Sequence, residues 1–224
     1  MDIYESEQEQ VEALKRWWKE NGTAVIAGLV IGLAGLFGWR SWQAHIRAES
    51  DAASIAYQDM VSKMVEKKPK AAAGVGEALI KKYPDSAYAN LAALTVAKVE
   101  ADRGDLDKAK QQLEWVIAHG DLAEVKKMAR IRLGRVLLAA GKPDEAWNAI
   151  APLKSDTSLL SLEELKGDIL AAQDKKEAAR TAYLQALTLA QTVRADKGFL
   201  EMKLDALGKP TAAAADTAKT SEIQ

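Results

Sequence analysis

The sequence predicts an all-α protein in which a single N-terminal transmembrane helix precedes a solenoid of helical repeats. Three observations predict this fold. Residues 21–39 contain no charged side chain. Three later segments repeat one spacing of small and apolar residues. Helix-forming Ala, Leu, Lys, Glu and Gln dominate residues 48–207, where no run of alternating Val, Ile and Thr is long enough to predict a strand.

The uncharged segment, NGTAVIAGLVIGLAGLFGW, has 19 residues. As a helix it would extend roughly 28 Å, close to the ~30 Å thickness of the hydrocarbon core of a bilayer. Tryptophan prefers the membrane interface, and Trp pairs flank the segment: Trp17 and Trp18 before it, Trp39 and Trp42 after it. A long polar stretch precedes the segment, and residues 38–42 form a poor cleavage site. These features favour an uncleaved anchor over a buried core helix or a cleaved signal peptide.

Basic residues beside the segment predict its orientation. Lys15, Arg16 and Lys19 precede it, whereas Arg40 and Arg47 follow it. Because cytoplasmic flanks carry the excess of Lys and Arg, we expect the N-terminus in the cytoplasm. The predicted divisions are a cytoplasmic amphipathic segment at 1–20, a transmembrane helix at 21–42, a periplasmic repeat domain on the opposite side of the membrane at 43–207 and a disordered tail at 208–224.

The composition excludes several classes of site. Cys is absent from the sequence, which rules out a disulfide, a thiolate metal site and a Cys nucleophile. The two histidines, His45 and His119, are too few for a zinc site or a His-based triad. The formal net charge is −1 at pH 7, so there is no basic field for nucleic acid. We therefore predict no catalytic residue, no metal site and no cofactor.

The repeated spacing joins five positions in each of three segments, at intervals of +7, +5, +4 and +3. The segments are 37 and 33 residues apart, close to the ~34-residue tetratricopeptide period. Small residues let two antiparallel helices approach closely, and Gly or Asp at the turn tolerates a left-handed backbone. The positions are Ala97, Gly104, Ala109, Leu113 and Val116; Gly134, Gly141, Ala146, Ile150 and Leu153; and Gly167, Asp174, Ala179, Tyr183 and Ala186.

This spacing predicts a tetratricopeptide-like array of four helix pairs, of which the first has the weakest pattern. A terminal repeat must cover its outer apolar face, and a final amphipathic helix at 196–207 suits that purpose. An irregular helical bundle is the alternative. The expected pairs cover residues 48–83, 86–119, 122–154 and 158–190.

The first helices of such pairs line the inner surface of the solenoid, which is the predicted partner-binding groove. Apolar side chains beside mixed charges suit a peptide or a partner helix better than a small substrate. The alternative is that some of these residues belong to the core, because a small shift in register would turn them inward. The predicted groove residues are Leu91, Leu94, Lys98, Asp102, Met128, Ile131, Arg135, Leu138, Ser161, Glu164 and Asp168.

Two further contact surfaces are predicted near the N-terminus. Residues 5–20 have the pattern of an amphipathic helix, and we expect them to lie along the membrane surface. Within the span, a stripe of small residues would let a second transmembrane helix approach closely. The alternative is that the span is only a tether. The stripe consists of Ala24, Gly28, Gly32 and Gly35.

The N-terminal run DIYESEQEQVEALKRWWKENG, the glycine-rich span, the exit GWRSWQ and the helix SIAYQDMV, followed by the repeats, together resemble the YfgM family. That resemblance implies an ancillary subunit of the bacterial SecYEG translocon, anchored in the inner membrane with a periplasmic repeat domain. It also implies association with the periplasmic prolyl isomerase and chaperone PpiD. The groove could bind either unfolded client proteins or one fixed partner, and the sequence leaves both alternatives open. No catalytic residue is implied.

The leading functional hypothesis is thus a non-enzymatic interaction protein that assists secreted or envelope proteins as they emerge. Its expected partners are the translocon, periplasmic chaperones and membrane lipid, and not nucleic acid. The alternative is an anchored repeat scaffold for another envelope or cytochrome-maturation assembly. An enzyme is disfavoured because the sequence has no glycine-rich phosphate loop and no distinctive acidic pair.

Overall fold

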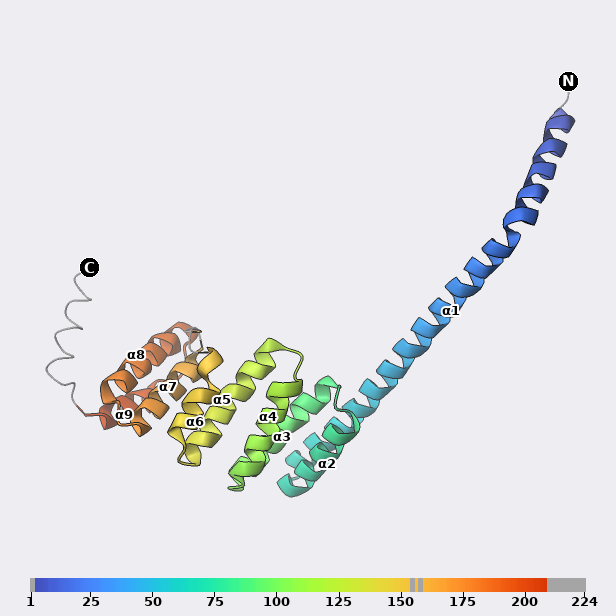
Figure 1. Cartoon of the computed structure of the whole chain (residues 1–224). Coiled ribbons are helices and arrows are strands. Elements are labelled where there is room, and N and C mark those ends of the chain that lie inside the picture. The colour runs from blue at the N-terminus through green and yellow to red at the C-terminus, as the bar shows by residue number, and fades with distance from the viewer. Residues whose placement is uncertain (1–2, 154–155, 157–158, 209–224) are drawn as a thin grey trace, which may run out of the picture. The chain divides into compact units, whose positions relative to one another are not determined.

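A computed structural model describes residues 3–153, 156 and 159–208, and its regular elements are all helices (Figure 1). The all-α prediction is confirmed. The predicted tail at 208–224 lies outside the described residues except for Gly208. The helices are α1 (Ile3–Val65), α2 (Pro69–Lys82), α3 (Ala87–Asp102), α4 (Leu106–His119), α5 (Ala123–Ala139), α6 (Pro143–Ala149), the 3-10 turn η1 (Ala151–Leu153), α7 (Leu160–Ala172), α8 (Lys176–Val193) and α9 (Gly198–Ala206).

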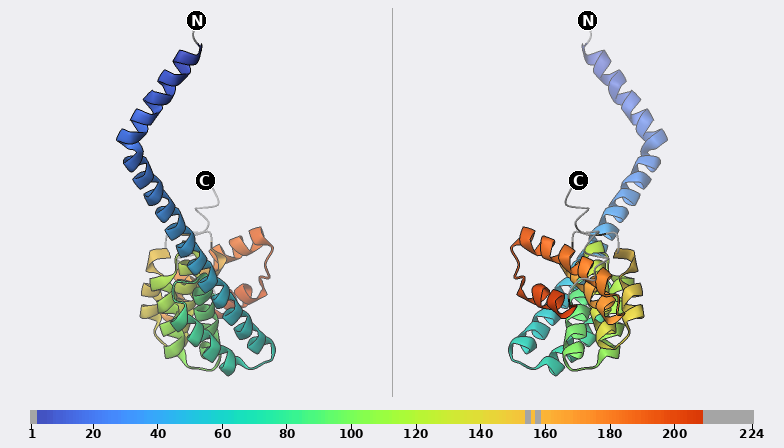
Figure 2. Two further views of the ribbon diagram at one scale, coloured as in Figure 1. Left: turned by 90° about the vertical axis from the view of Figure 1, so that its right-hand side faces the viewer. Right: turned by 90° about the vertical axis from the view of Figure 1, so that its left-hand side faces the viewer.

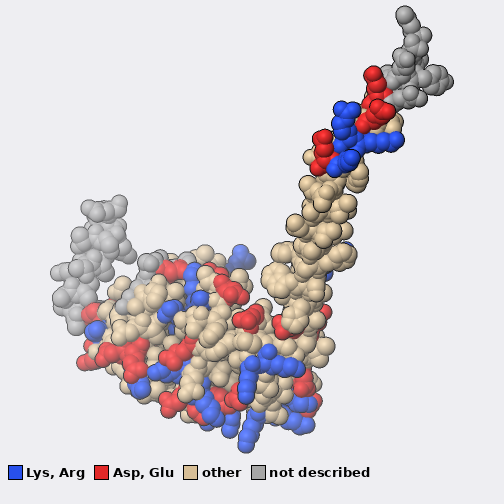
Figure 3. All heavy atoms as spheres, turned by 45° about the vertical axis from the view of Figure 1, so that its right-hand side comes forward, with Lys and Arg blue, Asp and Glu red and all other residues tan. Residues whose placement is uncertain are grey.

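The chain forms two compact units, Met1–Asp51 and Ala52–Gln224. The first unit consists of the N-terminal part of α1, which is one continuous helix of 63 residues and contains both the predicted amphipathic segment and the predicted span. Its apolar side chains are exposed, and an uncharged length of helix follows the charged N-terminal turns (Figure 3). Within the described residues, α1 is the one helix long and apolar enough to cross a membrane.

The second unit contains the last turns of α1 and the helices α2 to α9. From α2 onward, successive helices pack against each other in chain order, and the first helices of the later pairs also contact one another: α3 contacts α5, and α5 contacts α7 (Figures 1 and 2). Their bounds follow the predicted pairs closely. Two starts show why: Ser86 caps α3 by accepting from the backbone N–H of Tyr88 at 3.2 Å, and Asp105 caps α4 by accepting from that of Lys108 at 3.1 Å.

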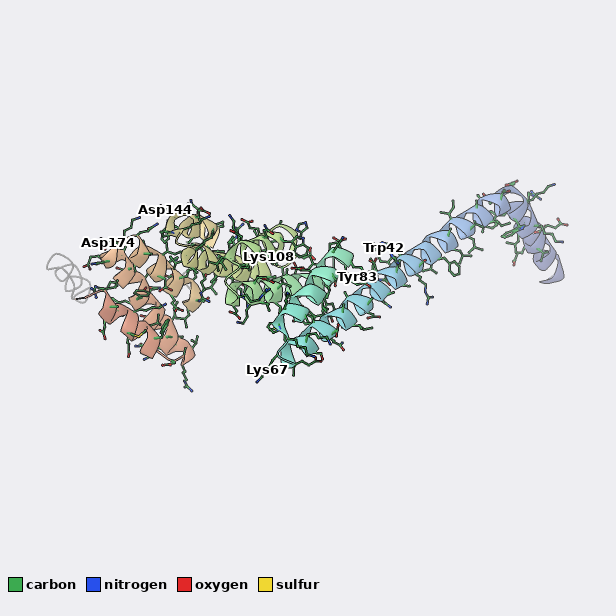
Figure 4. The ribbon with its side chains drawn as sticks, turned by 90° about the horizontal axis from the view of Figure 1, so that it is seen from below. Trp42, Lys67, Tyr83, Lys108, Asp144 and Asp174 are labelled. Atoms are coloured by element: carbon green, nitrogen blue, oxygen red, sulfur yellow. The ribbon has the colours of Figure 1, made fainter. Side chains whose placement is uncertain are left out.

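The turns inside the helix pairs are left-handed, as predicted for three of them. Gly104, Gly141 and Asp174 have φ of 85°, 73° and 58°. Lys67 has φ of 58° and lies 37 residues before Gly104, so the first helix pair repeats the same turn geometry. Figure 4 labels Lys67 and Asp174 at these helix ends.

The core depends on close contact between the two helices of each pair. The predicted small residues Ala109, Ala146 and Ala179 are each 0% exposed. Gly167 lies directly against the ring of Tyr183, and a Cβ atom on Gly134 would lie 3.2 Å from Cγ2 of Ile150. In these two pairs, residues sixteen positions apart in the repeat thus place a small residue on the first helix against a large one on the second.

The last helix covers the end of the array, as predicted. α9 places Leu200, only 4% exposed, in a small core with Ala179, Tyr183, Ala186 and Ala190 of α8. Its observed bounds, 198–206, lie just inside the expected 196–207. This small core encloses the end of the repeats, where α8 would otherwise expose its apolar side.

Candidate functional site

The candidate site is the surface formed by the first helices of three pairs, which we call the charged face. It contains one stripe from α3, one from α5 and one from α7, together with the side chain of Lys203 from α9. The stripes advance by three or four residues, which keeps side chains on one side of a helix. They consist of Leu91, Thr95, Lys98 and Asp102; Met128, Arg132 and Arg135; and Ser161, Glu164 and Asp168.

A pocket of about 390 Å³ opens in this face between α3 and α5. Three cationic side chains line it, namely Lys98, Arg132 and Arg135, with Asp102 as the acidic one. Its remaining walls are apolar: Ala97, Ala101, Leu113 and Val136.

An ionic network joins the C-terminal half of the face. Nζ of Lys203 donates to Oε1 of Glu164 at 2.7 Å and to Oδ2 of Asp168 at 2.9 Å. A nitrogen of Arg135 lies 3.6 Å from the carboxylate of Glu164. The hydroxyl of Tyr183 donates to Oδ1 of Asp168 at 2.8 Å. Since Lys203 belongs to α9, these contacts fasten the last helix across α7.

Burial keeps the Tyr183 hydroxyl of this network in its protonated form. The side chain is buried, and burial is the main cause that raises the pKa of its hydroxyl above the usual value. The hydrogen bond to Asp168 and the negative charges of Asp168 and Glu164 raise the pKa further. Tyr183 therefore stays protonated and remains a donor throughout the neutral range.

Arg132 differs from the other cations of the pocket. Lys98 pairs with Asp102 at 2.7 Å and Arg135 pairs with Glu164, but no hydrogen bond or ion pair joins Arg132 to any described residue. Its guanidinium is half-buried, and burial followed by the nearby charge of Arg135 lowers its pKa. The pocket thus holds one cation without a counter-charge.

The structure places most of the predicted groove residues on the charged face. Leu91 and Met128 are 40% and 44% exposed, and Lys98 and Arg135 are also exposed. Glu164 and Asp168 are half-buried within the ionic network, and half-buried Leu138 packs against the core.

Two residues that were predicted to line the groove are buried instead. Leu94 and Ile131 are 5% and 6% exposed and belong to the core, so they cannot contact a partner on this face. Their neighbours Thr95 and Arg132 occupy the surface positions instead. The sequence could have identified Arg132 as a surface residue, because it lies three residues before Arg135 on the same side of the helix.

The small stripe of the span faces open space within the first unit. Ala24 is exposed, and a Cβ atom added at Gly28, Gly32 or Gly35 would meet nothing within 4 Å. In the segment that precedes the span, four apolar side chains are at least half exposed: Val11, Leu14, Trp17 and Trp18. Among the described residues, no group of three or more His, Asp or Glu side chains could hold a metal ion.

Comparison with known proteins extends over both units. Residues 15–209 match the family model for a tetratricopeptide repeat-like domain. The chain is 31% identical over 207 residues to a protein of Escherichia coli K12 named "Ancillary SecYEG translocon subunit", a match that covers 92% of this chain and 99% of that protein.

Two further relatives carry the same name. The one from Neisseria gonorrhoeae is 32% identical over 209 residues, covering 92% of this chain and 100% of the relative. The one from Haemophilus influenzae is 30% identical over 180 residues, covering 80% of this chain and 88% of the relative.

Proposed function

Because the chain belongs to the tetratricopeptide repeat-like family of ancillary SecYEG translocon subunits, we propose that it is a membrane-anchored, non-enzymatic protein that associates with the SecYEG translocon. The observation that carries this proposal is the length of the match. It spans nearly the whole of this chain and of its relatives, so it includes the apolar helix as well as the repeats.

The proposed topology places residues 1–20 in the cytoplasm, the span at 21–42 in the inner membrane and the repeats at 43–207 in the periplasm. The excess of Lys and Arg before the span supports this orientation. The exposed apolar side chains of α1 support the span, since they would otherwise face water. The stripe with Gly28 and Gly32 would then be available to a neighbouring transmembrane helix.

The charged face supports a second level of the proposal, in which the repeats assist secreted or envelope proteins as they emerge, together with periplasmic chaperones such as PpiD. Exposed Leu91 and Met128 stand beside charged groups on neighbouring helices. Apolar anchors beside polar groups can hold an extended peptide or one face of a helix. The predicted groove residues on this face are the proposed contact residues.

Photo-crosslinking in native membranes tests both levels. A photoreactive amino acid that replaces Leu29 probes the span, and one that replaces Leu91 or Met128 probes the charged face. As a control, the photoreactive amino acid replaces the exposed Gln185 on α8. We expect translocon subunits to be crosslinked from the span, and chaperones or emerging clients from the face, with little from Gln185. Adducts from both surfaces to a different envelope assembly, with none to translocon subunits, would instead establish the scaffold alternative.

A further inference from the structure

The exposed side of α8 differs from that of α2 and α4 because it carries no charge over most of its length. Residues 181–193 include no Asp, Glu, Lys or Arg, although these residue types make up 28% of the chain. The exposed side chains that follow one side of α8 form a surface that we call the neutral stripe. It consists of Thr181, Leu184, Gln185, Thr188, Gln191 and Thr192.

The repeat spacing shows which charge the neutral stripe lacks. Leu184 directly follows the core residue Tyr183. At the same position of the repeat, α4 has Glu114 and α2 has Glu77, and both glutamates are exposed. Leu184 is also exposed, at 51%. An exposed leucine thus stands where two other pairs have a carboxylate, and depletion of charge is the compositional signal of the centre of a protein interface.

The threonine hydroxyls of the neutral stripe already have partners within α8. Thr181 donates to the carbonyl of Glu177 at 3.1 Å, Thr188 donates to that of Leu184 at 3.0 Å, and Thr192 donates to that of Thr188 at 3.2 Å. These donors keep their hydrogen bonds when water is removed. Another protein surface can therefore cover the stripe without leaving them unsatisfied.

The neutral stripe is suited to pairing with itself. A two-fold interface brings the same surface of both subunits together, so a charge near the axis would lie close to its own copy. Thr181, Leu184, Thr188 and Gln191 advance by three, four and three residues, and this spacing is the same in both directions. An antiparallel second copy would therefore align all four positions, with Leu184 opposite Thr188 of the other copy.

We propose that α8 pairs in an antiparallel manner with α8 of a second copy of this chain, through the neutral stripe. Charge complementarity supports the orientation. Glu177 precedes the stripe and Arg194 follows it, so antiparallel pairing brings each carboxylate toward the guanidinium of the other copy. The same orientation places the positive end of each helix dipole beside the negative end of the other.

The size of the stripe limits the strength of this pairing. Stable interfaces bury roughly 800 Å² on each partner, which is more than one side of a single helix provides. The pairing is therefore weak between free molecules. Two copies anchored in one membrane have a higher effective concentration, a step that rests on the proposed membrane anchor.

Cysteine cross-linking tests the proposal directly, because the natural chain has no Cys. Full-length Leu184→Cys and Thr188→Cys, one of them with a size tag, are reconstituted together in phospholipid vesicles and treated with a short bismaleimide. Random encounter would give about twice as much mixed product as either same-residue product, whereas antiparallel pairing should raise that ratio to at least about 5-fold. Same-residue products that match or exceed the mixed one would overturn the proposal.

Two further variants make the result specific to the neutral stripe. Met202→Cys, at an exposed apolar residue of α9, is the matched control and should give little product. Adding Leu184→Glu to the Thr188→Cys chain restores the charge that α2 and α4 have. It should lower the mixed product at least about 5-fold, because pairing would bury a carboxylate without a partner. Circular dichroism verifies that each variant is folded.

A yield from Met202→Cys equal to that of the mixed pair would overturn the proposal, as would no effect of Leu184→Glu. The photo-crosslinking experiment gives a second readout, since Gln185 lies on the neutral stripe. That position should form adducts between two copies of this chain, and few with translocon subunits or chaperones. The vesicles contain neither the translocon nor a chaperone, so a failure of self-pairing would leave the proposed function unaffected.

Discussion

The sulfur of Met60 on α1 occupies the space beside Gly76 on α2, where a Cβ atom would approach it to 2.8 Å. In the next three pairs the positions sixteen residues apart are reversed in size: the small residue is on the first helix, and the large one, such as Ile150 or Tyr183, is on the second. The first pair therefore fills the same interhelical gap from the opposite side, which explains why its sequence pattern differs from that of the other three.

This reversal predicts coupled effects of substitution. Gly76→Leu should destabilise the repeats by about 1–3 kcal/mol, because the new side chain meets both Met60 and Val96. Adding Met60→Ala should cost less than the sum of the two single changes, since it opens space for the leucine. Urea unfolding followed by circular dichroism measures the free energy of unfolding of each single variant and of the double variant. Gly74→Ala on the same helix is the control: open space surrounds that position, so stability should rise by about 0.5–1 kcal/mol.

Tyr183 predicts a specific loss of stability in alkali. The pKa of Tyr183 in the folded state lies above its unfolded value of about 10. The stabilisation that the protonated hydroxyl provides is therefore fully present below pH 10 and is lost as pH rises further. Tyr183→Phe removes the hydrogen bond to Asp168 and should cost about 0.5–1.5 kcal/mol at pH 8. Urea unfolding of the unsubstituted protein and of Tyr183→Phe should be compared from pH 8 to pH 11. The difference between their free energies of unfolding should narrow above pH 10. A constant difference across that range would mean that ionisation of Tyr183 does not oppose folding.

Topology gives the third prediction. With Lys15, Arg16 and Lys19 before the span, a reporter enzyme active only in the periplasm should be active when fused after Leu207. A reporter active only in the cytoplasm should be inactive at the same junction. Activity of the cytoplasmic reporter instead would reverse the orientation and remove the repeats from the side where translocated proteins emerge.

The sequence predicted the helix pairs because their turns and close contacts require particular residue types. Gly104 and Gly141 adopt a left-handed backbone that few other residues tolerate, so their spacing reveals the repeat. The turn at Lys67 carries no such signal, because a residue with a Cβ atom adopts the same conformation there. Backbone hydrogen bonds close that turn, with the N–H of Lys68 donating to the carbonyl of Lys63 at 2.9 Å, and they do not require Gly. The first pair was therefore the hardest to predict.

The charged face was harder to predict than the fold. A helix has 3.6 residues per turn, so steps of three and four residues both stay near one side. From Met128 the sequence therefore allows Ile131 or Arg132 on the surface, and the contacts with neighbouring helices decide for Arg132. The ionic network was beyond local spacing altogether, since Lys203 reaches Glu164 and Asp168 from 39 and 35 residues away.

The last prediction concerns the span, where the structure makes a substitution unusually simple to interpret. A Cβ atom at Gly28 or Gly32 would meet no atom within 4 Å, so Gly28→Leu with Gly32→Leu should cause no clash within the described chain. The span also stays apolar, so membrane insertion should be preserved. In lipid, however, helices associate mainly through close packing of their surfaces, and two leucines would separate a neighbouring helix along the stripe. We therefore expect weaker co-purification with the translocon from detergent-solubilised membranes. The matched control, Leu29→Ile with Leu33→Ile, changes shape without adding volume and should have little effect. Unchanged recovery of the translocon with the leucine pair would show that the span is only a tether, and the repeats would then have to provide the association.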